Sequence, residues 1–234
     1  MPTLLLRLKG PQQSWGTDSR FRSRQTGIVP SKSGVLGLLA AAQGRPREAD
    51  LSDLVGLSFA VRVDQPGSLM VDYHTARAPG AKNPNLSHRH YRADAAFMAA
   101  VSGPSDLIQG LSEAIDNPAF PLFLGRRSCP VPWDLNAGVF EDETGADLLR
   151  DLGRVPWLAA EWYRRKAPTE VRLPIYRDAH RGEQGDTTAD VPLSFDPRHR
   201  RYATRHVVVD QPVVVDNELG QAPRDPFFDD VKEA

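Results

Sequence analysis

The chain has 234 residues, of which 40% are hydrophobic and 25% are charged, and its formal net charge is −1 at pH 7. These values fit a soluble globular protein with one large domain, or with one domain and a small appendage. The single cysteine, Cys129, excludes an internal disulfide framework and a cysteine-based zinc site. No stretch approaches the length of a membrane span, and the first apolar run is too short for a signal peptide. We therefore expect a cytoplasmic protein.

The charges are unevenly distributed along the chain. Arginine accounts for 24 of the 29 basic residues, which either reflects a GC-rich genome or serves phosphate contacts. Residues 1–40 carry six basic side chains and one acid, whereas residues 206–234 carry seven acids and two basic side chains. This asymmetry indicates a polyanionic partner, and the near-neutral total argues against non-specific coating of nucleic acid.

The first elements are predicted from apolar runs and their boundaries. Residues 3–9 form a short apolar run that is typical of a buried strand, and Gly10 ends it. A polar, basic loop is expected over 11–31, and connections of this length are usually functional or disordered. The apolar residues 33–42 then predict a helix with Ser31 or Ser33 as its N-cap.

The next segments predict strands over 59–63, 69–73 and 95–101, followed by a helix over 105–117. Ser105 is the expected N-cap of that helix. The order strand, helix, strand, strand, helix is most of a ferredoxin-like βαββαβ unit, so the fold class is predicted as α+β. The same unit underlies the RRM, whose sheet face binds RNA.

The remaining chain is predicted to be irregular and then rich in strands. Several prolines interrupt residues 118–136, and strands are expected over 162–166, 171–176 and 207–215. The predicted organisation is therefore a ferredoxin-like domain over 1–135, a small β-rich portion over 136–225 and an acidic tail over 226–234.

The start of the first helix is one candidate anion site. A helix N-terminus offers free backbone N–H groups, and Ser31, Lys32 and Ser33 add donors beside Gly34. The order of residues is not that of a Walker A loop. By local pattern alone an ordinary capped helix remains the more common explanation.

A second candidate is the loop that contains Gly125, Arg126, Arg127 and Ser128, preceded by Phe123. Adjacent arginines in a loop fixed by glycine and proline could hold two phosphates, or a phosphate and a base edge, and Phe123 could stack on a base. A solvated arginine pair explains the pattern about equally well, because ordering two arginines costs side-chain entropy.

A third candidate comprises two stretches, 72–77 and 87–92, that would form the stems of a projecting hairpin over about 74–92. Aromatic and basic side chains interleave there, as single-strand binders require; they are Tyr73, His74, Arg77, Tyr91 and Arg92. The two histidines of the second stretch have too few potential co-ligands for a metal site.

Catalysis is the competing hypothesis for the same residues. His74, Tyr73 and Lys32 could cleave RNA by acid–base chemistry with an internal 2′-OH as nucleophile. The sequence contains no carboxylate pair, nucleophile motif or cofactor loop with a recognisable spacing. We therefore expect a protein that is not an enzyme and needs no cofactor or metal.

Four segments resemble a known family in their residues and in their order. They are LLLRLKGPQQSWG (residues 4–16), PSKSGVLGLL (30–39), DYHT (72–75) and FLGRRSCP (123–130). Together they resemble the type I-E form of the CRISPR-associated protein 5 family. Beyond about residue 135 the resemblance is loose.

The resemblance implies a ferredoxin-like (RRM-like) domain, a protruding β-hairpin thumb and a small C-terminal β-rich portion. It implies a non-catalytic subunit of the antiviral Cascade ribonucleoprotein complex that caps the 5′ handle of the CRISPR RNA. The implied neighbours are the backbone subunit CasC and the large subunit CasA, with target DNA reached through the guide. The alternative is a repeat endoribonuclease that generates the handle, as in type I-C relatives.

The resemblance also gives roles to the candidate residues. Handle phosphates would lie at the helix start and against the preceding loop, the arginine pair would contact phosphates or base edges, and residues 77–90 would form the thumb tip. The implied RNA-binding residues are Arg20, Arg22, Arg24, Ser31, Lys32, Ser33, Gly34, Tyr73, His74, Arg77, Tyr91, Arg92, Phe123, Gly125, Arg126, Arg127 and Ser128.

Overall fold

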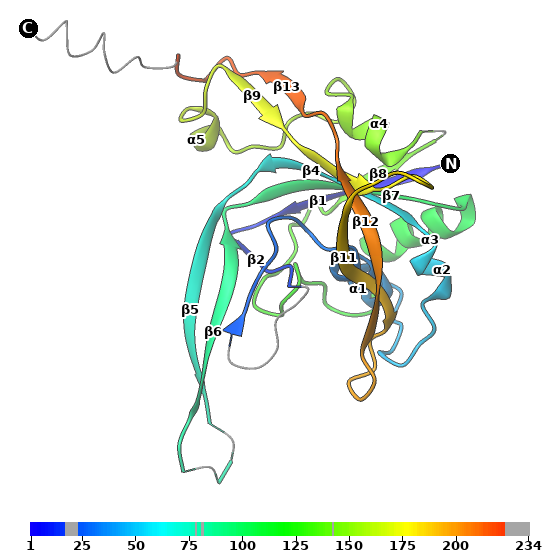
Figure 1. Cartoon of the computed structure of the whole chain (residues 1–234), viewed down its shortest axis with the longest axis vertical. Coiled ribbons are helices and arrows are strands. Elements are labelled where there is room, and N and C mark those ends of the chain that lie inside the picture. The colour runs from blue at the N-terminus through cyan, green and yellow to red at the C-terminus, as the bar shows by residue number, and fades with distance from the viewer. Residues whose placement is uncertain (17–22, 78, 81, 142, 223–234) are drawn as a thin grey trace, which may run out of the picture.

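The structure is a computed structural model that describes residues 1–16, 23–77, 79–80, 82–141 and 143–222. Its centre is a seven-stranded sheet in the order β11-β12-β10-β4-β7-β1-β8, in which each pair of neighbours is antiparallel (Figure 1). The strands are β1 Thr3–Lys9, β4 Ser58–Gln65, β7 Ala96–Ser102, β8 Asn136–Phe140, β10 Ile175–Asp178, β11 Asp186–Ser194 and β12 Arg201–Val209. The protein is therefore a mixed α/β structure built on antiparallel pairing.

Two helices, α1 (Lys32–Ala42) and α3 (Ser105–Asp116), cover one face of this sheet. Alternate residues of β1, Leu4, Leu6 and Leu8, point into the core that these helices share. The short helix α2 (Ser52–Val55) adds to the same core through its one buried side chain, that of Leu54. Burial of these apolar side chains is the main driving force that holds the layers together.

The opposite face of the central strands is covered as well. Leu5, Met98 and Ala100 pack with Leu148 and Leu149 of α4 (Gly145–Arg150). All seven residues of β7 are consequently buried, and strands buried on both faces read as continuous apolar runs. The open sheet face with which an RRM binds RNA is therefore not free at these strands.

A buried ion pair fixes the covering segment to the second face. Arg62 and Asp64 of β4 are joined by two hydrogen bonds of 2.6 and 2.9 Å. The Arg62 guanidinium also donates to the carbonyls of Leu149, Val155 and Pro156. Burial raises the pKa of Asp64 despite this partner. Because a buried charge needs a full set of partners, the pair specifies how residues 149–158 lie.

A long hairpin of β5 (Ser68–Ala76) and β6 (Asn85–Ala93) projects from the body (Figure 1). Two short strands, β2 (Gln12–Gln13) and β3 (Ser23–Arg24), pair with β6 near its base and along its edge. The hairpin starts earlier than the predicted span of 74–92, since β5 begins at Ser68 and ends at Ala76. The expected tip over 77–90 is therefore too long, because β6 already begins at Asn85.

The C-terminal part differs from the prediction in three respects. Residues 162–166 are not a strand, since α5 (Glu161–Arg164) lies there. Proline interrupts the two other predicted strands: 171–176 divides at Pro174 into β9 (Glu170–Leu173) and β10, and 207–215 divides before β13 (Val213–Asp216). Strands β9 and β13 form a separate two-stranded sheet.

The predicted boundary at residue 135 does not divide two sheets, because β8, β10, β11 and β12 all join the sheet of the N-terminal strands. The N-cap of α3 is Pro104 and not Ser105, whose backbone is already helical. Among the described residues, no helix is long and apolar enough to cross a membrane. The acidic tail, 226–234, lies outside the described residues.

Candidate nucleic-acid interface

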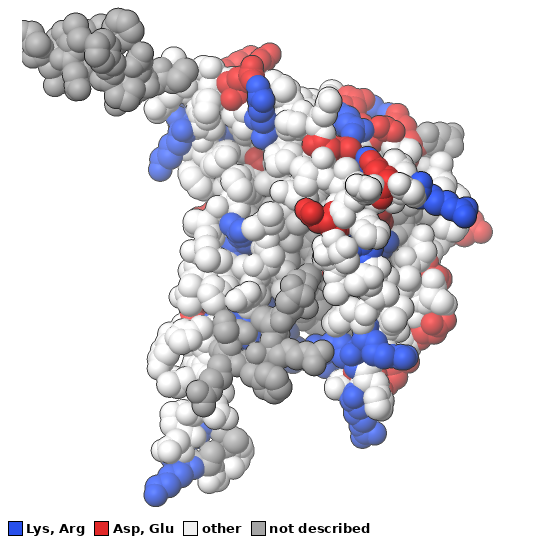
Figure 2. Space-filling view, viewed as in Figure 1, with Lys and Arg blue, Asp and Glu red and all other residues white. Residues whose placement is uncertain are grey.

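A broad groove of about 1560 Å³ lies beside α1 and brings together segments that are distant in the sequence. Figure 2 shows basic side chains along the lower part of the molecule, while most acidic side chains on this face lie on its upper part and right edge. None of the described residues that line the groove is acidic, and seven are arginines: Arg24, Arg45, Arg47, Arg126, Arg127, Arg200 and Arg201. In a chain with a net charge of −1, this is a strong local concentration of positive charge.

The loop of residues 123–130, the arginine loop, lies at one side of the groove and is held in a single tight conformation. The Leu124 amide donates to the Cys129 carbonyl at 2.7 Å, and the Cys129 amide donates to the Arg126 carbonyl at 2.8 Å. Gly125 adopts a φ of +84°, and a Cβ at this position would lie 1.7 Å from the Ser14 carbonyl oxygen. Only glycine fits this close approach, so Gly125 sets the direction of the two arginines.

Arg126 is oriented by contacts on two sides. Its Nη2 atom donates to the Arg24 carbonyl at 2.8 Å, and its guanidinium lies 4.6 Å from the centre of the Tyr91 ring. The Tyr91 hydroxyl in turn shares a hydrogen bond of 3.4 Å with Ser128. The Nη1 atom of Arg126 is buried and has no partner among the described residues. A buried donor without a partner is costly, so this atom is suited to an acceptor on a ligand.

The other predicted residues of this region differ in whether they line the groove and in how exposed they are. Arg24 and Arg127 are exposed and line it, and Phe123 is half-buried and lines it as well. Tyr91 is almost fully buried and its ring packs against the Arg126 guanidinium, so the ring is not open for stacking on a base. Arg20 and Arg22 lie outside the described residues.

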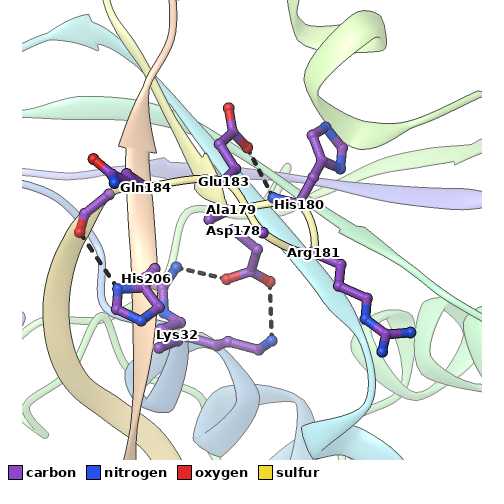
Figure 3. A pocket seen from close by; sticks show the side chains of 11 residues that line it. Lys32, Asp178, Ala179, His180, Arg181, Glu183, Gln184 and His206 are labelled. Atoms are coloured by element: carbon purple, nitrogen blue, oxygen red, sulfur yellow. Dashed lines mark hydrogen bonds and ion pairs between the residues drawn. The ribbon is translucent and has the colours of Figure 1, made fainter.

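The start of α1 is already occupied by carboxylates of the protein itself. Asp190 Oδ2 accepts a hydrogen bond of 2.7 Å from the Lys32 amide, and Ser31 caps the helix by accepting from the Gly34 amide at 3.2 Å. The Lys32 ammonium is nearly buried and lies 3.0 Å from Asp178 Oδ2 (Figure 3). The positive end of the helix and the lysine therefore both have partners, and Lys32 lines a smaller pocket that also contains His180 and His206.

Ser31, Ser33 and Gly34 nevertheless line the large groove. A Cβ on Gly34 would lie 2.8 Å from the ring of Trp15, which is buried beneath the helix start. The glycine therefore permits the close packing of α1 on Trp15, and its place in the sequence has a structural reason that does not require a phosphate.

The predicted residues of the hairpin do not line this groove of seven arginines, the arginine groove. Tyr73 is exposed and contacts His88, with 5.3 Å between the ring centres, and His74 Nδ1 lies 3.8 Å from Asp72. Arg92 donates to the Gly27 carbonyl at 3.4 Å. Tyr73, His74, Arg77 and Arg92 are not among the residues that line the groove. The structure therefore separates these four residues from the groove, whereas Tyr91 of β6 packs on Arg126 and joins the base of the hairpin to the second candidate.

The proposed acid–base set is not assembled either. Lys32 lies in the pocket with Asp178, whereas Tyr73 and His74 are on the projecting hairpin. Among the described residues, no group of three or more His, Cys, Asp or Glu side chains could hold a metal ion.

Sequence reasoning missed one part of the groove entirely. Arg45 and Arg47 follow α1, Arg200 ends the turn between β11 and β12, and Arg201 and Tyr202 begin β12. The run HRRY (199–202) is a visible basic and aromatic pattern in the sequence. Its position at the same groove as residues 123–127 depends on the pairing of β10 with β4, which attaches the C-terminal strands to the central sheet, and on contacts of β11 with α1.

Comparison with known proteins identifies the family. The family model described as CRISPR-associated protein (Cas_Cas5) matches residues 3–208. The chain belongs to the Cas5 family. It is 37% identical over 157 residues to the CRISPR system Cascade subunit CasD of Escherichia coli (strain K12), which covers 58% of this chain and 70% of that protein. The family inferred from the four sequence segments is thereby confirmed.

Two solved structures are similar over almost the whole chain. A chain of a CRISPR RNA-guided surveillance complex has a TM-score of 0.73 and 31% identity, over 99% of this chain and 98% of that one. A Cas protein crystal structure has a TM-score of 0.69 and 38% identity, over 94% of this chain and 98% of that one. The similarity therefore includes the C-terminal strands as well as the four sequence segments.

Proposed function

We propose that this Cas5 chain is the CRISPR-RNA-binding subunit of a type I-E Cascade complex and that it holds the 5′ handle of the guide without cutting it. The observation that carries the proposal is the groove with seven arginines and no acidic residue among its described lining. Such a surface attracts a polyanion, and guanidinium groups suit both phosphates and base edges. The similarity to the Cascade subunit CasD selects CRISPR RNA as that polyanion.

The fold proposed for the RNA-binding part is ferredoxin-like, as in an RRM. Its support is the connection β1–α1–β4 and β7–α3–β8 together with the sheet order β4-β7-β1-β8. The hairpin β5–β6 is inserted between β4 and β7 and corresponds to the thumb. RNA would lie beside this domain in the groove, since the second sheet face is covered by α4 and the following segment.

Within the groove, the proposed contacts follow the geometry of the arginine loop. Arg126 offers its unpartnered Nη1 atom to a phosphate or a base acceptor, and the exposed Arg24 and Arg127 bind neighbouring phosphates. Phe123 stacks on a base. Ser31 and Ser33 line the groove near the helix start. Lys32 is left out of this set, because Asp178 already neutralises it.

The proposed partners are the backbone subunit CasC, the large subunit CasA and, through the guide, target DNA, all within the cytoplasm. A role without catalysis is supported by the separation of Lys32 from the hairpin that carries Tyr73 and His74. The runner-up is a repeat endoribonuclease. Incubation of the purified chain with its repeat RNA should leave the RNA intact; a defined handle product that disappears with His74→Ala would favour the runner-up.

The test of RNA binding is the double variant Arg126→Ala, Arg127→Ala in the co-expressed complex. We expect it to retain less CRISPR RNA per complex than the wild-type protein, because two groove cations are lost. The matched control is Arg165→Ala, Arg172→Ala, which removes two exposed arginines outside the groove. Equal RNA occupancy in both variants and in the wild-type complex would remove the arginine loop from the interface.

A further inference from the structure

We propose that the end of the β11–β12 hairpin, its turn together with the first residues of β12, is a second RNA-binding wall of the groove, in which Arg200 and Arg201 bind phosphates and Tyr202 provides an aromatic surface. This inference rests on the proposed function and adds a part of the chain that lies 70 residues or more beyond the arginine loop. All three residues line the same groove as Arg126 and Arg127.

The two arginines are available to a ligand. Arg200 and Arg201 are exposed, and neither forms an ion pair with another described residue. The acid nearest to them along the chain, Asp196, is used within the turn, where its carboxylate accepts from the Arg198 amide at 2.8 Å. The Asp196 carboxylate is therefore bonded to the backbone of the turn, and the two arginines present their positive charge to the groove.

The hairpin is held firmly against α1, so its arginines have a defined position. A Cβ on Gly37 of the helix would lie 3.2 Å from the Phe195 ring, which packs directly on the helix at this point. Asp190 of β11 accepts from the Lys32 amide at 2.7 Å, and Arg205 of β12 binds Asp190 through two hydrogen bonds of 2.6 and 2.9 Å. These contacts join the hairpin to the helix that also lines the groove.

Such a preformed wall has a consequence for affinity. A surface that is already ordered loses less conformational entropy when a strand binds than a flexible loop would. Tyr202 pairs with Pro192 across the hairpin and is half-buried, so its ring has a restricted orientation. Aromatic side chains beside a cationic track are the arrangement with which proteins bind single-stranded RNA without reading every base.

The experiment measures binding of the full-length chain to a fluorescently labelled single-stranded RNA with the cognate repeat sequence, as a function of salt concentration. For Arg200→Ala, Arg201→Ala we expect weaker binding and a slope of log K against log salt that is smaller by about 1.4, since each phosphate contact on a single strand contributes about 0.7. The matched control, Arg198→Ala, changes the same turn at a residue that does not line the groove and should retain the wild-type slope.

The outcomes separate this inference from the proposed function. If Arg126→Ala, Arg127→Ala weakens binding while Arg200→Ala, Arg201→Ala leaves affinity and slope unchanged, the second wall is wrong and the RNA-binding role stands. If both pairs of substitutions leave binding unchanged, the proposed function fails as well. Circular dichroism melting of each variant establishes that the chain remains folded, and a slope reduced only in variants with a lowered melting temperature would also overturn the inference.

Discussion

The Asp190 carboxylate accepts a hydrogen bond of 2.7 Å from the backbone amide of Lys32, at the first turn of α1. A helix start is a common anion site, but here the anion is supplied by the protein from a residue 158 positions later in the chain. The same carboxylate binds Arg205, which also contacts Asp178, the partner of Lys32. This ionic network joins α1 to β10, β11 and β12.

Removal of that carboxylate should loosen the hairpin. Asp190→Ala leaves the Lys32 amide and most of the Arg205 guanidinium without their partner, which we expect to lower the free energy of unfolding by about 1–3 kcal/mol. Urea denaturation measures the change. The control is Asp186→Ala, at the exposed start of the same strand. An Asp190→Ala midpoint equal to that of the control would show that the network contributes nothing to stability.

The conformation of the arginine loop should require glycine at position 125 for two reasons, the absence of a Cβ and the positive φ. Gly125→Ala places a Cβ against the Ser14 carbonyl in addition to the strain of a positive φ, so we expect a loss of stability and of RNA binding. Gly182 is the matched control, because it has a φ of +85° but nothing within 4 Å of its Cβ position. Thermal melting should show a larger loss for Gly125→Ala. Equal losses would mean that the loop moves away from Ser14 without cost.

The single thiol reports on the same loop. Cys129 is fully buried, and burial raises the pKa of its thiol, so at pH 8 little thiolate is present in the folded protein. We expect slow reaction with Ellman's reagent in buffer and prompt reaction in denaturant, and faster reaction in Gly125→Ala than in Gly182→Ala. Prompt reaction of the native wild-type protein would contradict the closed loop described above.

Local patterns predicted the N-terminal elements well. The apolar run of β1 and the helices α1 and α3 lie within one or two residues of their predicted bounds, because their residues bury a regular face or a continuous run. The prediction of a strand over 162–166 was wrong. Aromatic residues favour strands in general, but the backbone forms the short helix α5 there. Tertiary context outweighed propensity at that site.

The candidate site was predicted only where neighbours in the sequence are neighbours in space. Arg126 and Arg127 sit in one loop and were identified. Lys32 was expected to bind phosphate, yet its partner Asp178 comes from a strand 146 residues away, which no local pattern reveals. The contribution of Arg200 and Arg201 depends likewise on how β10 extends the sheet from β4.

Photo-crosslinking of the RNA in the assembled complex tests the central claim most directly. CRISPR RNA labelled with 4-thiouridine in its 5′ handle would be irradiated in the purified complex, and the crosslinked peptides of this chain identified by mass spectrometry. We predict crosslinks in 123–128 and in 195–202, two of the segments that line the arginine groove. Handle crosslinks confined to segments outside the groove, such as α4, α5 or β13, would contradict the account.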